Sequence, residues 1–214
     1  MGDQGLFLVF EGVEGSGKST QAALLGKWLE ARGIDHIVTR EPGGTEIGEQ
    51  IRALVLESEA LPARSELLLL LSARSIFVEE VVRPALAAGR VVIADRYELS
   101  TFAYQGYGRG LALGAVRAMN EFATGGLRPD LTLLLDVPVV VGGARRASAG
   151  RAPDRIEREA SGFHDRVGEA YRLLAVTEPG VERIDGTGSP EEVHREVLRR
   201  LALHFPETFP PGAG

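Results

Sequence analysis

The stretch LFLVFEGVEGSGKST, residues 6–20, decides the fold of this chain. Its apolar beginning, residues 6–10, has β character, and Lys18, Ser19 and Thr20 open a segment that can form a helix. Between them, Gly12 and the run Gly17-Lys18-Ser19 fit the P-loop pattern G-x-x-x-x-G-K-[ST], whose backbone N–H groups surround phosphate oxygens. The sequence therefore predicts a strand, a phosphate-binding loop and a helix in direct succession.

Lys18 and Ser19 are the side chains of this loop with a chemical role. We expect Lys18 to reach the β- and γ-phosphates of a nucleotide and Ser19 to place its hydroxyl on Mg²⁺. Lys18 and Lys27 are the only lysines, so arginine fills nearly every basic position and a lysine in this motif is informative. The residues expected to bind the nucleotide here are Gly12, Val13, Glu14, Gly15, Ser16, Gly17, Lys18, Ser19 and Thr20.

Length and composition limit the protein classes. A chain of 214 residues with 44% hydrophobic residues can bury one good core, so we expect one domain over residues 1–205 and a loose tail over residues 206–214. The absence of cysteine excludes disulfides, thiolate catalysis and zinc sites built on sulfur. A net charge of -6 argues against a broad nucleic-acid surface, and neither a signal peptide nor a membrane-length apolar run is found. We expect a soluble cytoplasmic protein that binds neither nucleic acid nor membranes.

Strands and helices alternate along the rest of the chain. Further strands are predicted at 34–39, 91–94, 131–135 and 181–185. Helices are predicted at 21–32, 47–57, 65–88, 113–124, 163–176 and 190–205, with a weaker one at 139–146. The helix at 65–88 should be capped by Ser65 and interrupted near its end by Pro84. This alternation predicts an α/β fold with a parallel sheet and helices on both of its faces.

Several arginines lie where such a sheet would gather its loops. Asp95-Arg96-Tyr97 directly follows a buried strand, at the edge where open α/β sheets bind ligands. Residues 145–158 are rich in arginine and poor in apolar residues, which predicts an exposed excursion. With Arg40 and Arg74, these guanidinium groups suit two phosphorylated substrates placed in line. A phosphate monoester acceptor is already anionic at neutral pH and would need no catalytic base.

Two other activities remain open from the residues alone. A switch GTPase is disfavoured because an N-K-x-D motif is absent, and no strand ends in the Asp-Glu pair of hydrolytic ATPases. A deoxynucleoside kinase would need a carboxylate base, for which Glu14 or Glu41 could serve. A regulatory P-loop ATPase that switches a protein partner would ignore nucleoside monophosphates.

The segment IADRYELSTFAYQ, residues 93–105, resembles the signature of the thymidylate kinase family. The order of FEGVEGSGKST, TREPGGT, Ser72-Ala73-Arg74, DRY, RPDLTLLLDV and IDGT is similar to that family over nearly the whole chain. The resemblance implies a P-loop nucleoside monophosphate kinase fold with a five-stranded parallel core and a small arginine-rich lid at about 145–158. It also implies phosphorylation of dTMP to dTDP by ATP with Mg²⁺, usually by a homodimer.

The resemblance further implies roles for residues on the acceptor side. Arg96 would clamp the acceptor phosphate, and Asp95 would join Ser19 at the Mg²⁺ shell. Glu14 would meet the sugar 3′-hydroxyl, and Tyr104 would fill the space of a ribose 2′-hydroxyl. Arg74 would hydrogen-bond the thymine edge. The residues expected to line the dTMP side are Glu14, Arg40, Glu41, Pro42, Leu70, Arg74, Arg96, Ser100, Thr101, Tyr104 and Gln105.

On the donor side, the resemblance places Arg145, Asp185 and Thr187 beside the adenine. Gly15 lies where some family members carry a basic residue, so the remaining charge should come from the lid. The residues expected to act on the transferring phosphoryl group are Lys18, Asp95, Arg96, Arg145, Arg151 and Arg155.

Two departures from the family pattern stand out. Leu70 takes the place of a phenylalanine that stacks on thymine in many relatives. The segment VPVVVGG, residues 137–143, replaces a Pro-Glu pair that usually opens the following helix.

Overall fold

A parallel sheet forms the centre of the molecule. The computed structural model describes residues 5–148, 150 and 153–210, and within these ranges five strands pair in the order β2-β3-β1-β4-β5. Every pairing is parallel. The strands are β1 (Leu6–Glu11), β2 (His36–Arg40), β3 (Val91–Asp95), β4 (Leu131–Asp136) and β5 (Val181–Asp185). The predicted α/β fold with a five-stranded parallel core is confirmed.

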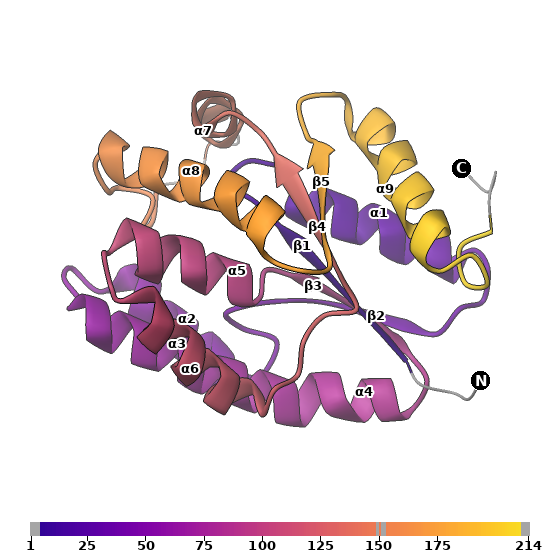
Figure 1. Cartoon of the computed structure of the whole chain (residues 1–214), viewed down its shortest axis with the longest axis horizontal. Helices are drawn as coiled ribbons and strands as arrows, with labels where there is room; N and C mark the ends of the chain where they lie inside the picture. Colours follow the sequence, from indigo (N-terminus) through magenta and orange to yellow (C-terminus); the bar gives the residue numbers. More distant parts are fainter. Residues whose placement is uncertain (1–4, 149, 151–152, 211–214) are drawn as a thin grey trace.

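Helices cover both faces of the sheet (Figure 1). They are α1 (Lys18–Glu30), α2 (Glu46–Glu57), α3 (Ala63–Phe77), α4 (Arg83–Ala87), α5 (Glu98–Thr101), α6 (Leu113–Thr124), α7 (Val139–Ser148), α8 (Ser161–Thr177) and α9 (Pro190–His204). Two π-helical segments, η1 (Val78–Val82) and η2 (Phe102–Gly108), continue α3 and α5.

Successive side chains of the central strand β1 point to opposite faces, as strand geometry requires. Leu8 and Phe10 are fully buried in a cluster with residues of α1 and α9. Phe7 and Val9 are fully buried on the other face, against α3 and η1. The P-loop therefore follows a strand that is packed on both faces, and this strand gives the loop a rigid base.

The long helix predicted at 65–88 is divided in three. Pro62, not Ser65, is its N-cap, and α3 begins at Ala63. The π-helical turn η1 precedes α4, which has Pro84 in its first turn. Pro84 has no N–H to donate to the carbonyl four residues earlier, so the hydrogen-bond register changes just before it.

The helix formed by α5 and η2 was not predicted from the sequence. It begins three residues after β3 and runs through the segment ELSTFAYQGYG. Its sequence has low helix propensity, because it contains Gly106, Gly108 and several aromatic and β-branched residues. This helix carries Ser100, Thr101 and Gln105, so its position decides the shape of the side that is expected to bind the acceptor.

Two predictions of exposed or loose chain need correction. Phe209, in the expected tail, is 1% exposed and stacks on Trp28 with ring centroids 5.2 Å apart, whereas residues 211–214 lie outside the described residues. In the expected excursion, Arg155 and Glu157 are buried. Phe209 packs against the rest of the domain through its apolar contact with Trp28. Arg155 does so through buried hydrogen bonds to Val55 and Glu66.

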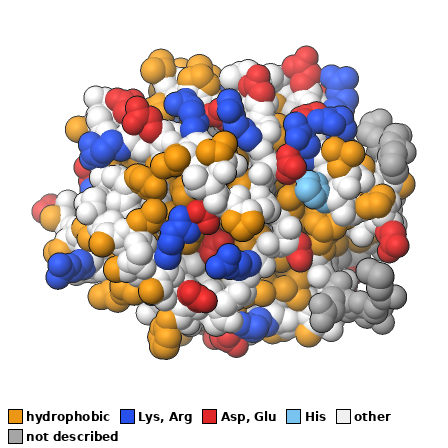
Figure 2. All heavy atoms as spheres, in the orientation of Figure 1, with side chains coloured by type: hydrophobic (Ala, Val, Ile, Leu, Met, Phe, Trp, Pro, Cys, Tyr) orange, Lys and Arg blue, Asp and Glu red, His pale blue; other side chains and the backbone are white. Residues whose placement is uncertain are grey.

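The surface shows no dominant charge on the face drawn in Figure 2. Acidic and basic side chains of the described residues are interspersed there with apolar ones. Among the helices of the described ranges, none combines the length with the apolar character that a bilayer crossing requires.

Candidate functional site

A cavity of about 640 Å³ lies at the carboxyl ends of the strands. The register of the sheet places Phe10, Arg40 and Asp95 at the same level, so the segments that follow β1, β2 and β3 meet at one edge. Its volume is in the range of small-molecule sites. The predicted site residues that line it are Glu14, Gly15, Ser16, Gly17, Lys18, Ser19, Thr20, Arg40, Glu41, Pro42, Leu70, Arg74, Asp95, Arg96, Ser100, Thr101, Tyr104, Gln105 and Arg145.

The P-loop wraps around the ammonium group of Lys18. Lys18 Nζ donates to the carbonyl oxygens of Gly12 at 3.1 Å and Val13 at 2.9 Å. Burial lowers the pKa of Lys18, and the nearby Arg96 lowers it further. Gly12 and Val13 shape the loop from behind, with Val13 in the apolar core.

The lid helix α7 lies directly on the P-loop backbone. Gly15 has a φ of +73°, and a Cβ atom there would be 2.1 Å from the Gly142 carbonyl oxygen. A Cβ atom on Gly142 would be 2.3 Å from the carbonyl oxygen of Glu14. Only glycine fits at both positions, which gives a physical reason for the unusual VPVVVGG segment and for the absence of a basic side chain at position 15.

Ser19 and Asp95 were predicted to hold a metal, and the structure brings them together. Ser19 Oγ donates a hydrogen bond to Asp95 Oδ2. A hydroxyl and a carboxylate are the hard oxygen ligands that Mg²⁺ accepts. In the described part of the chain, no group of three or more His, Asp or Glu could hold a metal by itself. The pair therefore fits a Mg²⁺ ion that takes most of its ligands from water and substrate phosphates.

Arg96 lines the cavity in a strained conformation. Its φ is 79°, which is uncommon for a residue other than glycine and costs about 1 kcal/mol or more. Arg96 Nη2 donates to Glu14 Oε1 at 2.5 Å, and Nη1 donates to Ser100 Oγ at 2.9 Å and Tyr171 Oη at 3.1 Å. Burial opposes the charged form of Arg96, but Glu14, together with Tyr104, Tyr171 and Asp95, outweighs burial and raises the pKa of Arg96 well above its ordinary value.

Glu14 is a charged carboxylate in this setting. Burial alone would raise its pKa, but Arg96, Lys18 and Arg146 outweigh burial and lower the pKa to about 2. Its carboxylate therefore stays ionised at neutral pH, where it can accept a hydrogen bond but is a weak base.

Glu11 was not identified from the sequence, although it holds the segment after β3 in place. Its side chain is fully buried. Glu11 Oε1 accepts from the backbone N–H groups of Tyr97 at 2.8 Å and Ser100 at 3.0 Å. Glu11 Oε2 accepts from Ser100 Oγ at 2.7 Å and Tyr171 Oη at 3.0 Å. These bonds hold Arg96 in its strained conformation, and a charged residue closing a buried strand is the signal that could have revealed Glu11.

A buried ion pair, Arg74 with Glu41, lines the cavity. Arg74 Nε donates to Glu41 Oε1 at 2.7 Å, and the same guanidinium donates to Asn120 Oδ1 at 2.6 Å and to the Tyr97 carbonyl oxygen at 2.9 Å. Burial raises the pKa of Glu41, although Arg74 opposes it. Burial likewise raises the pKa of Tyr104. An arginine has five N–H groups, so Arg74 can make these bonds and still donate to a ligand.

A further arginine, Arg52, lines the cavity beside Arg40. Arg52 Nη1 donates to the Pro42 carbonyl oxygen at 2.9 Å, and Arg40 Nη2 donates to Glu49 Oε2 at 3.0 Å. Burial lowers the pKa of Arg52, and Arg40 adds to this effect. An arginine whose pKa is lowered by burial and by a neighbouring guanidinium is suited to an anionic ligand. From the sequence alone, Arg52 is expected only to lie on the polar face of a helix.

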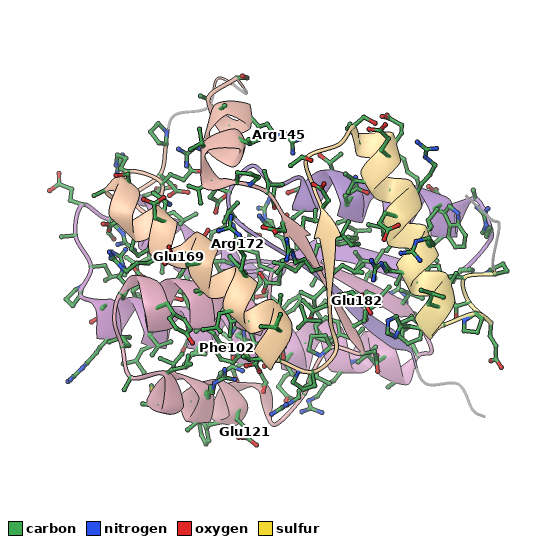
Figure 3. The ribbon with its side chains drawn as sticks, turned by 45° about the horizontal axis from the view of Figure 1, so that its top comes forward. Phe102, Glu121, Arg145, Glu169, Arg172 and Glu182 are labelled. Atoms are coloured by element: carbon green, nitrogen blue, oxygen red, sulfur yellow. The ribbon has the colours of Figure 1, made fainter. Side chains whose placement is uncertain are left out.

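Arg145 extends from α7 toward the loop after β5 (Figure 3). Its Nη1 donates to the Gly186 carbonyl oxygen at 2.8 Å and its Nη2 to the Thr187 carbonyl oxygen at 2.9 Å. Asp185 Oδ1 accepts from the Thr187 N–H at 2.9 Å. Gly186 and Gly188 line the cavity, while Asp185 and Thr187 close the turn that carries them.

The other lid arginines have different positions. Arg146, within the arginine-rich segment 145–158, lines the cavity. Arg155 does not line it, because its guanidinium donates to Glu66 Oε2 at 2.6 Å and to the Val55 carbonyl oxygen at 2.9 Å. Arg151 lies outside the described residues.

The chain is similar to known proteins both in its sequence and in its fold. The family model described as thymidylate kinase matches residues 10–197. The chain belongs to the thymidylate kinase family. It is 47% identical to the thymidylate kinase of Nostoc punctiforme over 205 residues, which cover 94% of this chain and 97% of that protein. It is 51% identical to the thymidylate kinase of Desulfovibrio desulfuricans over 199 residues, 88% of this chain and 91% of the relative.

A solved thymidylate kinase structure, from Ehrlichia chaffeensis, has the same fold. It matches with a TM-score of 0.77 and 30% sequence identity, covering 92% of this chain and 99% of that one. The resemblance seen in the sequence is thus confirmed. Of the two departures expected from the sequence, Leu70 lines the cavity and the segment that contains Gly142 packs against the P-loop.

Proposed function

We propose that this protein transfers the γ-phosphoryl group of ATP to dTMP, forming dTDP and ADP. The observation that carries the proposal is that one cavity joins the P-loop to the acceptor side around Arg96, with the Ser19–Asp95 pair between them. Two nucleotides bound there would meet with their phosphates facing each other. Membership of the thymidylate kinase family supports dTMP as the acceptor.

Catalysis would then consist of positioning and neutralisation of charge. Lys18 would exchange the loop carbonyls that it contacts for the β- and γ-phosphate oxygens, and the loop N–H groups would hold the β-phosphate. Arg96 would bind the dTMP phosphate, with Arg40 and Arg52 adding positive charge on the same side. The acceptor phosphate is itself the nucleophile, so the in-line step needs no general base.

The carboxylates of the cavity disfavour transfer to a sugar hydroxyl. Glu14, with a pKa of about 2, is a poor base at neutral pH. Glu41 accepts from Arg74 Nε with both of its oxygens. A regulatory ATPase, for its part, would have no use for the acceptor half of the cavity.

Mg²⁺ would be held by Ser19 and Asp95. When bound, the ion would supply positive charge that neutralises the phosphates of ATP. The hydrogen bond between Ser19 Oγ and Asp95 Oδ2 supports this assignment.

Base and sugar selection would come from the acceptor side. Arg74, with Thr101 and Gln105, would hydrogen-bond the thymine, and Leu70 would contact its face. Tyr104, which is 6% exposed, would occupy the space of a ribose 2′-hydroxyl. Glu14 would accept from the 3′-hydroxyl. Arg145 and the turn at Asp185 and Thr187 would flank the adenine, and Arg146, which lines the cavity, would reach the phosphates.

We further propose a homodimer in the cytoplasm. Large apolar side chains are exposed on neighbouring helices, with Leu54 on α2, Leu68 on α3 and Phe122 on α6 at 51%, 54% and 91%. Burial of such side chains against a second copy would stabilise association. Light scattering coupled to size-exclusion chromatography tests this, and a monomer at micromolar concentration would contradict it.

A coupled assay of ADP release tests the main proposal. The wild type should use dTMP in preference to dUMP, dCMP, dGMP and dAMP, and should not use thymidine. Lys18→Ala serves as the control for contaminating activity. A clear preference for another monophosphate, use of thymidine, or hydrolysis indifferent to every acceptor would refute the proposal.

A further inference from the structure

Glu66 is a fully buried carboxylate that does not line the cavity. It lies in the first turn of α3 and accepts hydrogen bonds from three side chains. Gln105 Nε2 donates to Oε1 at 2.7 Å, and Arg155 Nη2 donates to Oε2 at 2.6 Å. Arg109 donates to both oxygens, through Nε at 3.1 Å and Nη2 at 3.0 Å. A carboxylate this deeply buried is retained only where such partners compensate its desolvation.

The three partners come from two segments that are far apart in the sequence. Gln105 lies in η2, Arg109 directly follows η2, and Arg155 lies between α7 and α8. Arg155 is also tied to the end of α2, since its backbone N–H donates to the Leu56 carbonyl oxygen at 3.1 Å. Glu66 therefore joins α3, η2, the end of α2 and the chain after the lid helix at one point.

The charges at this point are balanced within the protein. Arg109 Nη1 donates to Glu159 Oε1 at 2.5 Å in addition to its bonds with Glu66. Two guanidinium groups thus face two carboxylates. Burial raises the pKa of Glu66, but hydrogen bonds from Arg109, Gln105 and Arg155 outweigh it and lower the pKa. The positive charge of Arg155 is already compensated by Glu66, 89 residues away in the chain.

Each of these segments contributes to the acceptor side of the cavity. Gln105 lines it, as do Val55 and Leu56 at the end of α2 and Ile156 next to Arg155. Leu70 and Arg74 follow Glu66 at four-residue spacing, so the three side chains lie along one face of α3. Glu66 is thus placed directly behind the wall that would contact the base of the acceptor nucleotide.

We propose that Glu66 is a positioning residue for the acceptor base, and that Arg155 serves as its partner and does not act on the transferring phosphoryl group. The bond to Glu66 orients the Gln105 carboxamide, and the bond to Arg155 holds Ile156 as part of the wall. This rests on the proposed transfer to dTMP, and it assigns Arg155 a role different from the one expected from the sequence.

Steady-state kinetics of two variants test the proposal. Glu66→Gln keeps the shape but removes the charge, and Arg155→Met keeps an unbranched apolar stem while leaving Glu66 bonded to Arg109 and Gln105. In each variant we expect the KM for dTMP to rise about tenfold or more, as loss of a charge-assisted hydrogen bond behind a binding wall predicts. The KM for ATP should stay within about twofold and kcat at saturation within about threefold. Calorimetric titration with dTMP alone should show the same weakening.

Two comparisons separate positioning from general loss of stability. Glu178→Gln removes another partly buried ion pair, with Arg117 Nη2 at 2.5 Å, away from the cavity lining, and should leave both KM values unchanged. The double variant Glu66→Gln/Arg155→Met should raise the KM for dTMP by less than the product of the single effects. If Glu66→Gln does not fold, Arg155→Met carries the test alone.

The proposal is overturned by any of three results. These are a raised KM for ATP with an unchanged KM for dTMP, a fall in kcat of about 100-fold or more at saturation in Arg155→Met, and no change in either variant. If the wild type prefers a different nucleoside monophosphate, the proposed function fails, and the same comparison made with that monophosphate still tests the role of Glu66.

Discussion

Replacement of Glu11 by glutamine tests how the cavity holds its central arginine. The side chain of Glu11 is fully buried and accepts four hydrogen bonds, from Tyr97, Ser100 and Tyr171. Glutamine has the same shape, and its amide oxygen can still accept the two backbone N–H groups. Its NH₂ group must then face the hydroxyls of Ser100 and Tyr171, which can accept as well as donate. The substitution therefore removes charge and leaves the geometry in place.

The magnitude follows from these four bonds. Hydrogen bonds to a charged group contribute about 1.5–3 kcal/mol, and neutral ones about 0.5–1.5 kcal/mol. A loss of about 1 kcal/mol per bond gives roughly 4 kcal/mol, which the lower cost of burying a neutral amide offsets in part. We expect the free energy of unfolding to fall by about 2 kcal/mol, a decrease of about 4–8 °C in Tm for a chain of this size. The KM for dTMP should rise several-fold, because Arg96 is held less firmly.

Thermal and urea unfolding followed by circular dichroism, together with dTMP kinetics, measure both effects. Glu11→Ala should lose more than Glu11→Gln, since it leaves two buried N–H groups without an acceptor. Glu182→Gln is the control, because its ion pairs with Arg200 and His204 lie near the surface, and it should change stability by less than about 1 kcal/mol. Glu11→Gln with wild-type stability and an unchanged KM for dTMP would refute the reasoning.

Three further predictions concern the P-loop and its neighbours. Arg96→Ala should reduce turnover far more than ATP affinity, because the guanidinium would bind the acceptor phosphate; equal losses in kinetic and ATP-titration measurements would argue against this. Gly142→Ala should raise the KM for ATP and lower turnover, because its Cβ would lie 2.3 Å from the Glu14 carbonyl oxygen, whereas Gly143→Ala, with nothing within 4 Å of its Cβ, should behave as wild type in the same assay. The pKa of Glu14 is about 2 in the folded protein against an ordinary value of 4.5, so its stabilising contribution is present above pH 4.5 and is lost as the pH falls toward 2. The difference in unfolding free energy between wild type and Glu14→Gln should therefore shrink over that interval, and a constant difference would contradict the assignment.

The sequence by itself determined the class of fold, the phosphate loop and the family. The periodicity of apolar residues and the spacing of Gly12, Gly17 and Lys18 are local properties of the chain. The helices, strands and loop that they predict depend largely on local backbone preferences, so the sequence shows them directly. The alternation of strands with helices is then compatible with few sheet topologies, because the crossover connections between parallel strands are right-handed. The short motif around Asp95 and Arg96 identified the edge of the sheet at which the ligands would bind.

Only the tertiary structure decided which side chains support that edge. Glu11 meets Tyr171 across 160 residues, and Glu66 meets Arg155 across 89, and no spacing in the sequence links either pair. The contact of Gly15 with Gly142 likewise exists only after α7 has packed on the P-loop. Such contacts depend on how the helices are placed relative to the sheet. Because an unpaired buried polar group is costly, each one forms hydrogen bonds with the groups that this placement brings close to it.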